Sequence, residues 1–138
     1  MSDAGEDLLE LFALNDSPMA QGFGFRTVSA SRDCVVAELL VEERHSNRNG
    51  VLHGGTIMAL ADNTAGTATF LNLPEGFGTT TVESKTNFFA AIKVGDLARA
   101  EATPLHRGRT TMVWQTRITR PDGKLAAMVT QTQLVMKK

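Results

Sequence analysis

The segment Gly54–Leu71, which reads GGTIMALADNTAGTATFL, constrains the fold of this chain more than any other, because Asp62 is its only charged residue. On a helical wheel, small and apolar residues surround that position on every side, and a helix that is apolar all round is normally buried. Gly66 and the threonines of the segment are poor helix formers, so tertiary packing has to hold it helical. The pattern predicts a buried central helix.

Asp62 is the candidate functional group of this helix. Burying a carboxylate is costly unless it is paired or hydrogen-bonded, and the helix contains no Lys or Arg that could pair with it. An expensive charge without an obvious structural partner is typical of a functional site. Two structural alternatives remain open. Asp62 lies on a narrow solvent-facing stripe with Asn63 and Thr69, or it pairs with an Arg from a strand.

His53, Gly54 and Gly55 stand directly before or at the start of the helix and indicate an anion-binding end. The first backbone N–H groups of a helix point outward with partial positive charge, and glycines leave them sterically open to an anion or a developing oxyanion. Asp62 lies about 10.5 Å beyond Gly55 along the helix axis, too far for one helix to place both groups on one reacting carbon. We therefore expect composite sites in a homodimer, where Asp62 of one chain meets Gly55 of the other.

The rest of the chain reads mainly as strands, which together with one central helix predicts an α+β fold with a mostly antiparallel sheet. Before the helix we expect a short amphipathic helix at Leu8–Leu14, strands at Phe23–Ala30 and Asp33–Val41, and a polar loop at Glu42–Gly50. After it we expect strands at 79–91, 96–106, 110–120 and 124–136. The whole chain, 1–138, is expected to form a single domain in which residues 1–20 are an N-terminal helical segment.

Composition and charge exclude several classes of protein. The net charge is −1 and the basic residues are scattered, so neither a nucleic-acid-binding face nor a basic membrane-binding surface is expected. No apolar run approaches the roughly 20 residues that cross a bilayer. The acidic N-terminus lacks the basic and apolar regions of a signal peptide. We expect a cytoplasmic protein.

Other reactive side chains form no recognisable constellation. Cys34, the only cysteine, lies in an apolar strand-like run and is predicted to be a buried core thiol, and Trp114 is predicted to pack in the sheet core. His45 and His106 belong to no convincing cluster. No group of His, Cys and acidic residues has metal-ligand spacing, so no metal is expected. A nucleophile-elbow sequence for a serine triad is also missing.

A recognisable motif leads into the central helix. It reads Asn47-Arg48-Asn49-Gly50-Val51-Leu52-His53-Gly54-Gly55 and continues with Leu60-Ala61-Asp62. Looser matches follow at 80–83, 87–89, 94–97 and 106–109. These motifs extend from about Glu42 to the C-terminus, and they resemble the hotdog-fold acyl-CoA thioesterases of the phenylacetic-acid-degradation (PaaI-like) type.

The resemblance implies a particular architecture and substrate class. In that family a long central helix is wrapped by a curved antiparallel sheet, two protomers join their sheets edge to edge in a homodimer, and dimers often pair into a homotetramer. The substrate is an acyl-CoA. Coenzyme A would then be part of the substrate, and no separate cofactor is expected.

The resemblance also assigns roles to single residues. Asp62 would act as general base or nucleophile, and the Gly55 N–H, next to Gly54, would polarise the thioester carbonyl. Asn47 would help to hold the substrate or the attacking water, and His53 would brace the loop. Alternatively, Asn47 and His53 only satisfy backbone groups of their own loop.

One departure from the family concerns the hydroxyl that orients the water. Some relatives carry Ser or Thr one helical turn after the acid, where this chain has Gly66. Thr81, which matches a serine of another branch, could replace it, whereas Thr64 and Thr67 are less well aligned.

The turn Arg107-Gly108-Arg109 resembles the family's turn near the nucleotide end of CoA. Guanidinium groups bind phosphate well, which fits that role. An ordinary solvated hairpin turn is the alternative.

The expected function is hydrolysis of an aromatic or short- to medium-chain acyl-CoA to the free acid and CoA. Thiols ionise far more readily than alcohols, so the thiolate needs little help from an acid in order to leave. Two alternatives stay open: a hotdog dehydratase or hydratase, and a non-catalytic acyl-CoA-binding or regulatory protein of the same fold.

Overall fold

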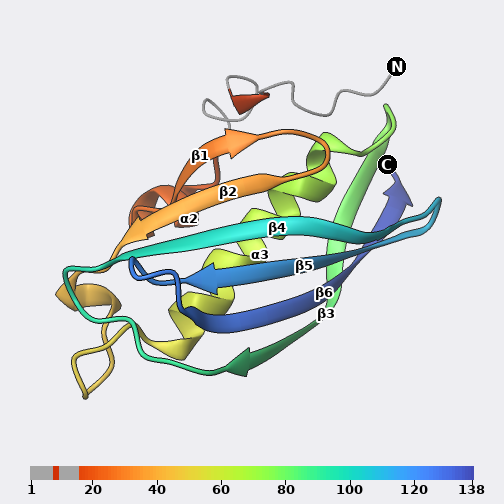
Figure 1. The fold of residues 1–138 in the computed structure, drawn as a ribbon. Helices are drawn as coiled ribbons and strands as arrows, with labels where there is room; N and C mark the ends of the chain where they lie inside the picture. Colours follow the sequence, from red (N-terminus) through yellow and green to blue (C-terminus); the bar gives the residue numbers. More distant parts are fainter. Residues whose placement is uncertain (1–7, 10–15) are drawn as a thin grey trace.

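The computed structural model describes residues 8–9 and 16–138 of the chain. The helix predicted at Leu8–Leu14 lies outside the described residues except for its first two positions. Figure 1 shows one helix, α3 (Gly54–Leu71), lying along the concave side of a curved sheet. An α+β fold with one central helix on an antiparallel sheet was the prediction, and it is confirmed.

The sheet has six strands, every neighbouring pair of which is antiparallel, in the order β1-β2-β4-β5-β6-β3. Sequence neighbours β4, β5 and β6 pair as hairpins, whereas β3, which follows the helix, crosses over to the far edge beside β6. The predicted strands agree with these strands to within a few residues. The bounds are β1 (Arg26–Ala30), β2 (Val35–Leu40), β3 (Phe77–Phe88), β4 (Leu97–Arg107), β5 (Thr111–Thr119) and β6 (Leu125–Lys137).

A short helix, α2 (Pro18–Phe23), corrects the prediction of a strand that starts at Phe23. The Ser17 side chain accepts the N–H of Ala20, Pro18 occupies the first helical position, and Gly24 ends the helix with φ of 83°. Serine at an N-cap followed by proline is a known helix start, so this signal was present in the sequence. A 3-10 turn, η1 (Glu43–His45), lies within the predicted loop.

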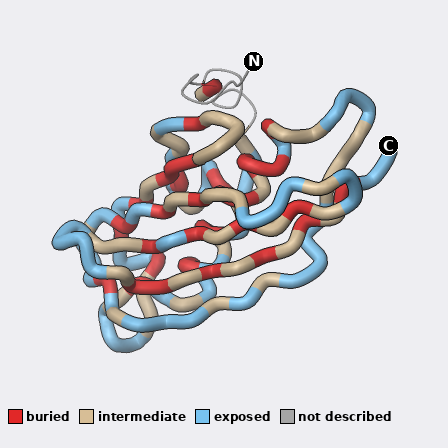
Figure 2. Tube along the Cα trace, turned by 45° about the vertical axis from the view of Figure 1, so that its right-hand side comes forward, coloured by how far each residue is buried: buried red, intermediate tan, exposed pale blue. Residues whose placement is uncertain are grey.

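The core lies between α3 and the inner face of the sheet. Three alanines on β4, at positions 98, 100 and 102, are fully buried, and their small side chains let the helix lie close to that strand. Trp114, Ile118 and Val129 fill the space on β5 and β6, which confirms the expectation that Trp114 packs in the core. Figure 2 shows this pattern as buried segments that recur along the helix and the central strands.

The edge strand β3 contains a bulge that decides which of its side chains face the helix. Thr79 and Thr81 lie opposite Val135 and Gln133 on β6, and the register then shifts between Thr81 and Glu83. The extra residue, Val82, changes the alternation of faces along the strand. The first half of β3 therefore presents threonines to α3.

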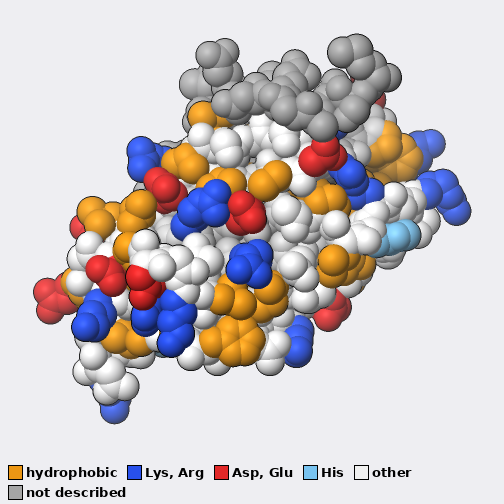
Figure 3. Space-filling model, viewed as in Figure 1, with side chains coloured by type: hydrophobic (Ala, Val, Ile, Leu, Met, Phe, Trp, Pro, Cys, Tyr) orange, Lys and Arg blue, Asp and Glu red, His pale blue; other side chains and the backbone are white. Residues whose placement is uncertain are grey.

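The surface in Figure 3 carries basic and acidic side chains interspersed with apolar ones. No single sign of charge dominates the face shown. Within the described part of the chain, no helix is long and apolar enough to cross a membrane.

Candidate active site

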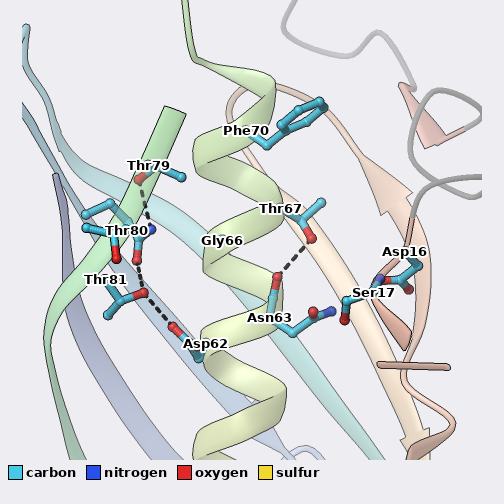
Figure 4. Close-up of a pocket in the computed structure, with 11 residues that line it drawn as sticks. Asp16, Ser17, Asp62, Asn63, Gly66, Thr67, Phe70, Thr79, Thr80 and Thr81 are labelled. Carbon is cyan, nitrogen blue, oxygen red and sulfur yellow. Dashed lines mark hydrogen bonds between the residues drawn. The ribbon is translucent and has the colours of Figure 1, made fainter. Parts of the chain in front are cut away.

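Asp62 lies near the middle of α3 and faces the start of β3. Its Oδ1 atom accepts a hydrogen bond from the Thr81 hydroxyl at 2.8 Å and a second one from Gln131 Nε2 at 3.0 Å. Figure 4 shows Asp62 and Thr81 pointing toward one another across the gap between helix and strand. Two donors from two different strands thus hold one carboxylate oxygen in place.

The prediction that Asp62 is buried is wrong for the single chain, where its side chain is exposed. Gly55, Met58 and Phe70 are also exposed, and their spacing puts them on the same face of α3 as Asp62. Thr69, which the solvent-stripe alternative included, is fully buried. The helix therefore has one open, largely apolar face, whereas a wheel of its residue types shows apolar character on all sides.

Among residues 8–9 and 16–138, no Lys or Arg pairs with Asp62, which removes the alternative of a strand arginine. Its contacts are with neutral donors. These donors hold one carboxylate oxygen in place and leave the carboxylate without a salt-bridge partner among the described residues.

Two glutamines on β6 form a second layer behind Asp62 that the sequence analysis missed. Gln131 Nε2 donates to Gln133 Oε1 at 2.8 Å as well as to Asp62. Gln133 Nε2 in turn donates to the Thr79 hydroxyl at 3.1 Å, and Gln133 Oε1 lies 2.6 Å from the Thr81 hydroxyl. The alternation of inward and outward residues along β6 could have predicted that both glutamines face the core. Only the strand register reveals that they meet Asp62.

A hollow of about 450 Å³ opens beside Asp62, between α3, β3 and the residues before α2. Thr79, Thr81 and Gln133 line its side toward the sheet, whereas Gly66 and Phe70 line its side toward the helix. Gly66 meets no heavy atom within 4 Å of where a Cβ would lie, so the wall beside Asp62 is open there. Neither Gly55 nor Asn47 lines this hollow.

The start of α3 is capped by His53. Its Nδ1 atom accepts the N–H of Gly55 at 2.8 Å, and its backbone carbonyl accepts the N–H groups of Thr56 and Ile57. His53 is therefore the N-cap of α3. In the single chain, the Gly55 N–H predicted to polarise a carbonyl is already bonded to the exposed His53 ring.

Gly54 packs closely at the same end. A Cβ on it would lie 3.2 Å from the Phe88 ring at the end of β3, so the ring would have to move slightly. The helix start and the edge strand thus lie close together.

Asn47 holds the loop that leads to the helix. Its Oδ1 atom accepts the backbone N–H of Asn49 at 2.8 Å and that of Val51 at 3.4 Å. A separate shallow hollow is lined by 46–49 and His53. Within one chain, the predicted site residues thus do not share one hollow. Asp62 and Thr81 lie in one hollow, and Asn47 and His53 lie in the other.

Arg107 is engaged within the chain. Its guanidinium bonds Asp33 Oδ1 at 2.8 Å and the Arg32 carbonyl at 2.9 Å, and it also contacts Asn72, the C-cap of α3. Gly108 and Arg109 line a hollow of about 350 Å³ beside Arg107, at the helix end opposite Gly55. Both arginines of this turn are exposed, and Arg109 is the one for which no ion pair is found among the described residues.

The remaining reactive side chains have structural surroundings. His45 is buried, its Nδ1 accepts the Glu42 N–H, and its Nε2 lies 2.7 Å from the Phe23 carbonyl, so the hydrogen must be on Nε2. Cys34 is half-buried rather than fully buried, and burial raises the pKa of its thiol. In the described ranges, no three His, Cys, Asp or Glu residues are arranged to hold a metal ion.

Comparisons with known proteins agree with the sequence motifs. Residues 49–127 match the family model described as the thioesterase superfamily. A curated 1,4-dihydroxy-2-naphthoyl-CoA hydrolase from Listeria monocytogenes is 29% identical over 120 residues, which cover 87% of this chain and 97% of that protein.

Two solved structures are similar to the whole described fold. A thioesterase from Haemophilus influenzae superposes with a TM-score of 0.86 at 30% identity, covering 94% of this chain and 90% of its own. The E. coli PaaI protein from the phenylacetic acid degradation operon superposes with a TM-score of 0.83 at 20% identity, covering 94% and 91%. The predicted hotdog fold is thereby confirmed, and the likeness to the PaaI protein is one of fold.

Proposed function

Because the chain belongs to the thioesterase superfamily, we propose that it hydrolyses acyl-CoA thioesters with Asp62 as the catalytic carboxylate. The single observation that carries this proposal is the position of Asp62. Its Oδ1 is held by Thr81 and Gln131, and its side chain lines an open hollow. A carboxylate that is fixed on one oxygen and accessible on the other suits proton transfer or nucleophilic attack.

The chemistry needs few groups. As a general base, Asp62 takes a proton from a water molecule, whose oxygen attacks the thioester carbonyl carbon to form a tetrahedral intermediate. The C–S bond then breaks, the acid is released, and the thiolate of CoA takes up a proton. As a nucleophile, Asp62 would instead attack the thioester carbonyl carbon, expel the thiolate of CoA and form a mixed anhydride, which water then hydrolyses at the Asp62 carboxyl carbon. A single turnover in ¹⁸O-water separates these routes, because the general-base route puts ¹⁸O into the first acid released, whereas hydrolysis at the Asp62 carboxyl carbon puts it into the enzyme.

The oxyanion donor is proposed to come from a partner chain. Gly55 and Asp62 of one chain do not line a common hollow, and the face of α3 that carries both residues is exposed and largely apolar. The free edge of β3 lies beside that face and carries the exposed Val82 and Phe88. A homodimer that covers this face would bring Asp62 of one protomer to Gly55 of the other. Pairing of such dimers into a homotetramer stays a prediction.

The partner's Gly55 N–H must be released before it can serve a substrate. His53 accepts that N–H in the single chain, but its ring is exposed and can rotate without disturbing the core. We propose that the thioester carbonyl takes the place of His53 Nδ1 on this N–H. Asn47 at the neighbouring loop would complete the polar side of the site, as the family resemblance implies.

The acyl group would lie along the hollow from Asp62 over Gly66 toward Phe70. Gly66 leaves room for a flat group, and Phe70 offers an aromatic surface at the far end. The relative from Listeria monocytogenes is named for an aromatic acyl-CoA, which supports testing aromatic acyl groups first. Short- and medium-chain acyl groups form the second half of the panel. Arg109 is the better candidate of the turn for the CoA phosphates, because Arg107 is occupied by Asp33.

Release of free thiol from an acyl-CoA panel tests the proposal. Wild-type protein should turn over at least one acyl-CoA, and Asp62→Asn should lower kcat by roughly 10²–10⁴-fold while it remains folded. Asparagine keeps the size of the side chain and removes the charge. Wild-type rates in Asp62→Asn would refute the assignment of the base. Saturable binding without thiol release would favour the non-catalytic alternative, and water addition or loss on an enoyl or hydroxyacyl thioester would favour the hydratase alternative.

A further inference from the structure

We propose that Gln131 is a positioning residue for the Asp62 carboxylate, and that Gln133 fixes the direction in which the Gln131 amide faces. This inference rests on the proposed function of Asp62 as the catalytic carboxylate. Gln131 acts through Asp62 and is not proposed to touch the substrate.

Core packing does not explain these two glutamines. On the inner face of β6 they follow Ala127 and Val129 and precede Val135, all of which are buried and apolar. Gln131 itself is 0% exposed and Gln133 is 2% exposed. Burying an amide costs free energy that an apolar side chain at the same place would avoid. A role other than core packing is therefore needed to explain why these two positions carry glutamine.

The hydrogen bonds of Gln131 are directed at Asp62 and Gln133. Its Nε2 atom donates to Asp62 Oδ1 at 3.0 Å and to Gln133 Oε1 at 2.8 Å, whereas its own Oε1 finds no partner in the described part of the chain. A buried amide that served only stability would have hydrogen-bond partners for both its N–H groups and its oxygen. In Gln131 only the Nε2 end, which faces the carboxylate, has such partners.

Gln133 determines which end that is. Its Nε2 is directed to the Thr79 hydroxyl, so its Oε1 faces Gln131 and requires a donor there. Of the two ends of the Gln131 amide, only Nε2 can donate to that oxygen. The same Nε2 carries a second hydrogen, which faces Asp62. The Thr79 hydroxyl on β3 thus orients the Gln133 amide, and the Gln133 amide orients the Gln131 amide. The Nε2 of Gln131 therefore faces the Asp62 carboxylate.

A count of hydrogens shows why Gln131 matters beside Thr81. The Thr81 hydroxyl lies within hydrogen-bond distance of two acceptors, Asp62 Oδ1 at 2.8 Å and Gln133 Oε1 at 2.6 Å, but it has one hydrogen to give. Gln131 Nε2 has two hydrogens for its two acceptors. The bond from Gln131 to Asp62 is therefore uncontested, whereas the bond from Thr81 is shared.

The first test replaces Gln131 with methionine, which has a similar length and no donor. We expect kcat for thiol release to fall roughly 10- to 100-fold, as for loss of a hydrogen bond to a charged group, with KM close to the wild-type value. Gln115→Met is the matched control, because Gln115 lies on the neighbouring strand β5 with its side chain on the other face of the sheet. Its kcat should be unchanged. Thermal unfolding of both variants checks that each remains folded.

The second test uses Gln131→Glu, which keeps the shape of the side chain and places a carboxyl group next to Asp62. Two carboxylates this close compete for protons, so the acidic limb of the pH profile of kcat should move to higher pH. A residue with a merely structural role would not move this limb. Gln115→Glu should leave the limb where it is in the wild type.

Asp62→Asn, measured in parallel, separates the two possible failures. If Asp62→Asn retains wild-type turnover, the proposed function of Asp62 fails, and the role of Gln131 fails with it. If Asp62→Asn is inactive but folded Gln131→Met has wild-type kcat and folded Gln131→Glu has an unchanged pH profile, only the positioning role of Gln131 is overturned.

Discussion

Replacing Thr81 with valine should lower turnover without changing the shape of the site. Valine has the size of threonine and keeps the β-branch that suits strand β3, but it has no hydroxyl to donate to Asp62 Oδ1. The change therefore isolates one hydrogen bond of 2.8 Å to the catalytic carboxylate.

The size of the effect follows from the contacts of that hydroxyl. A hydrogen bond to a charged group is worth about 1.5–3 kcal/mol. Because the Thr81 hydroxyl is shared with Gln133 Oε1, we expect the lower end, about 1.5 kcal/mol, which corresponds to about a tenfold decrease in kcat. KM should change less than kcat, because the bond holds the base and not the substrate.

The assay is release of free thiol from the acyl-CoA that wild-type protein hydrolyses best. Thr81→Ser keeps the hydroxyl and should retain most of the activity. Thr103→Val on β4 is the matched control, because Thr103 lies opposite Gln115 and its side chain points away from α3. If Thr81→Val is as active as wild type, or if Thr81→Ser loses as much as Thr81→Val, the hydroxyl does not support the base.

Three further outcomes are expected. Asp62→Asn and Gly55→Pro should each be inactive alone, but a mixture of the two chains, after dissociation and reassociation, should recover about a quarter of wild-type activity. The reason is that half of the dimers then hold one intact composite site. If no activity is recovered, both groups act within one chain. His53→Ala should lower the free energy of unfolding by about 1 kcal/mol in a denaturant titration, because the Gly55 N–H loses its cap, and His53→Asn should restore most of it. The hydrogen bond from Arg120 lowers the pKa of the Asp122 carboxyl to about 2, so this pair stabilises the fold above about pH 4 and stops doing so as the pH falls to about 2. Asp122→Asn should therefore lower the melting temperature at pH 6 but not at pH 2.

Several features of the fold follow from local sequence. The bounds predicted for α3, Gly54–Leu71, are those observed, because a stretch of small and apolar residues flanked by glycines and a polar C-cap is encoded by neighbouring residues. The strands of the C-terminal half were predicted within a few residues for the same reason. The missed helix α2 shows the limit of that reading, since its six residues are too few for a periodic pattern and only the Ser17–Pro18 start marks it.

Burial of Asp62 was predicted wrongly for a physical reason. A helical wheel records which residue types surround a position, but it does not record which side of the helix another element covers. The sheet covers one side of α3, so Gly55, Met58 and Phe70 are left exposed together with Asp62 despite the apolar composition of the segment. In the proposed homodimer, the partner chain would cover that face.

By itself, the sequence determined that Asp62 stands alone as a charge in an apolar helical pattern that begins with a His-Gly-Gly motif, because the pattern and the capping residue lie within a few positions of one another, although packing against the sheet is needed to hold the segment helical. Only the tertiary structure decided what holds that carboxylate. Gln131 lies 69 residues away along the chain and Thr81 lies 19 residues away. They meet Asp62 because the pairing of β3 with β6, and the bulge after Thr81, set which side chains face the helix. Strand register depends on the summed fit of the whole sheet, and no local pattern in the sequence contains it.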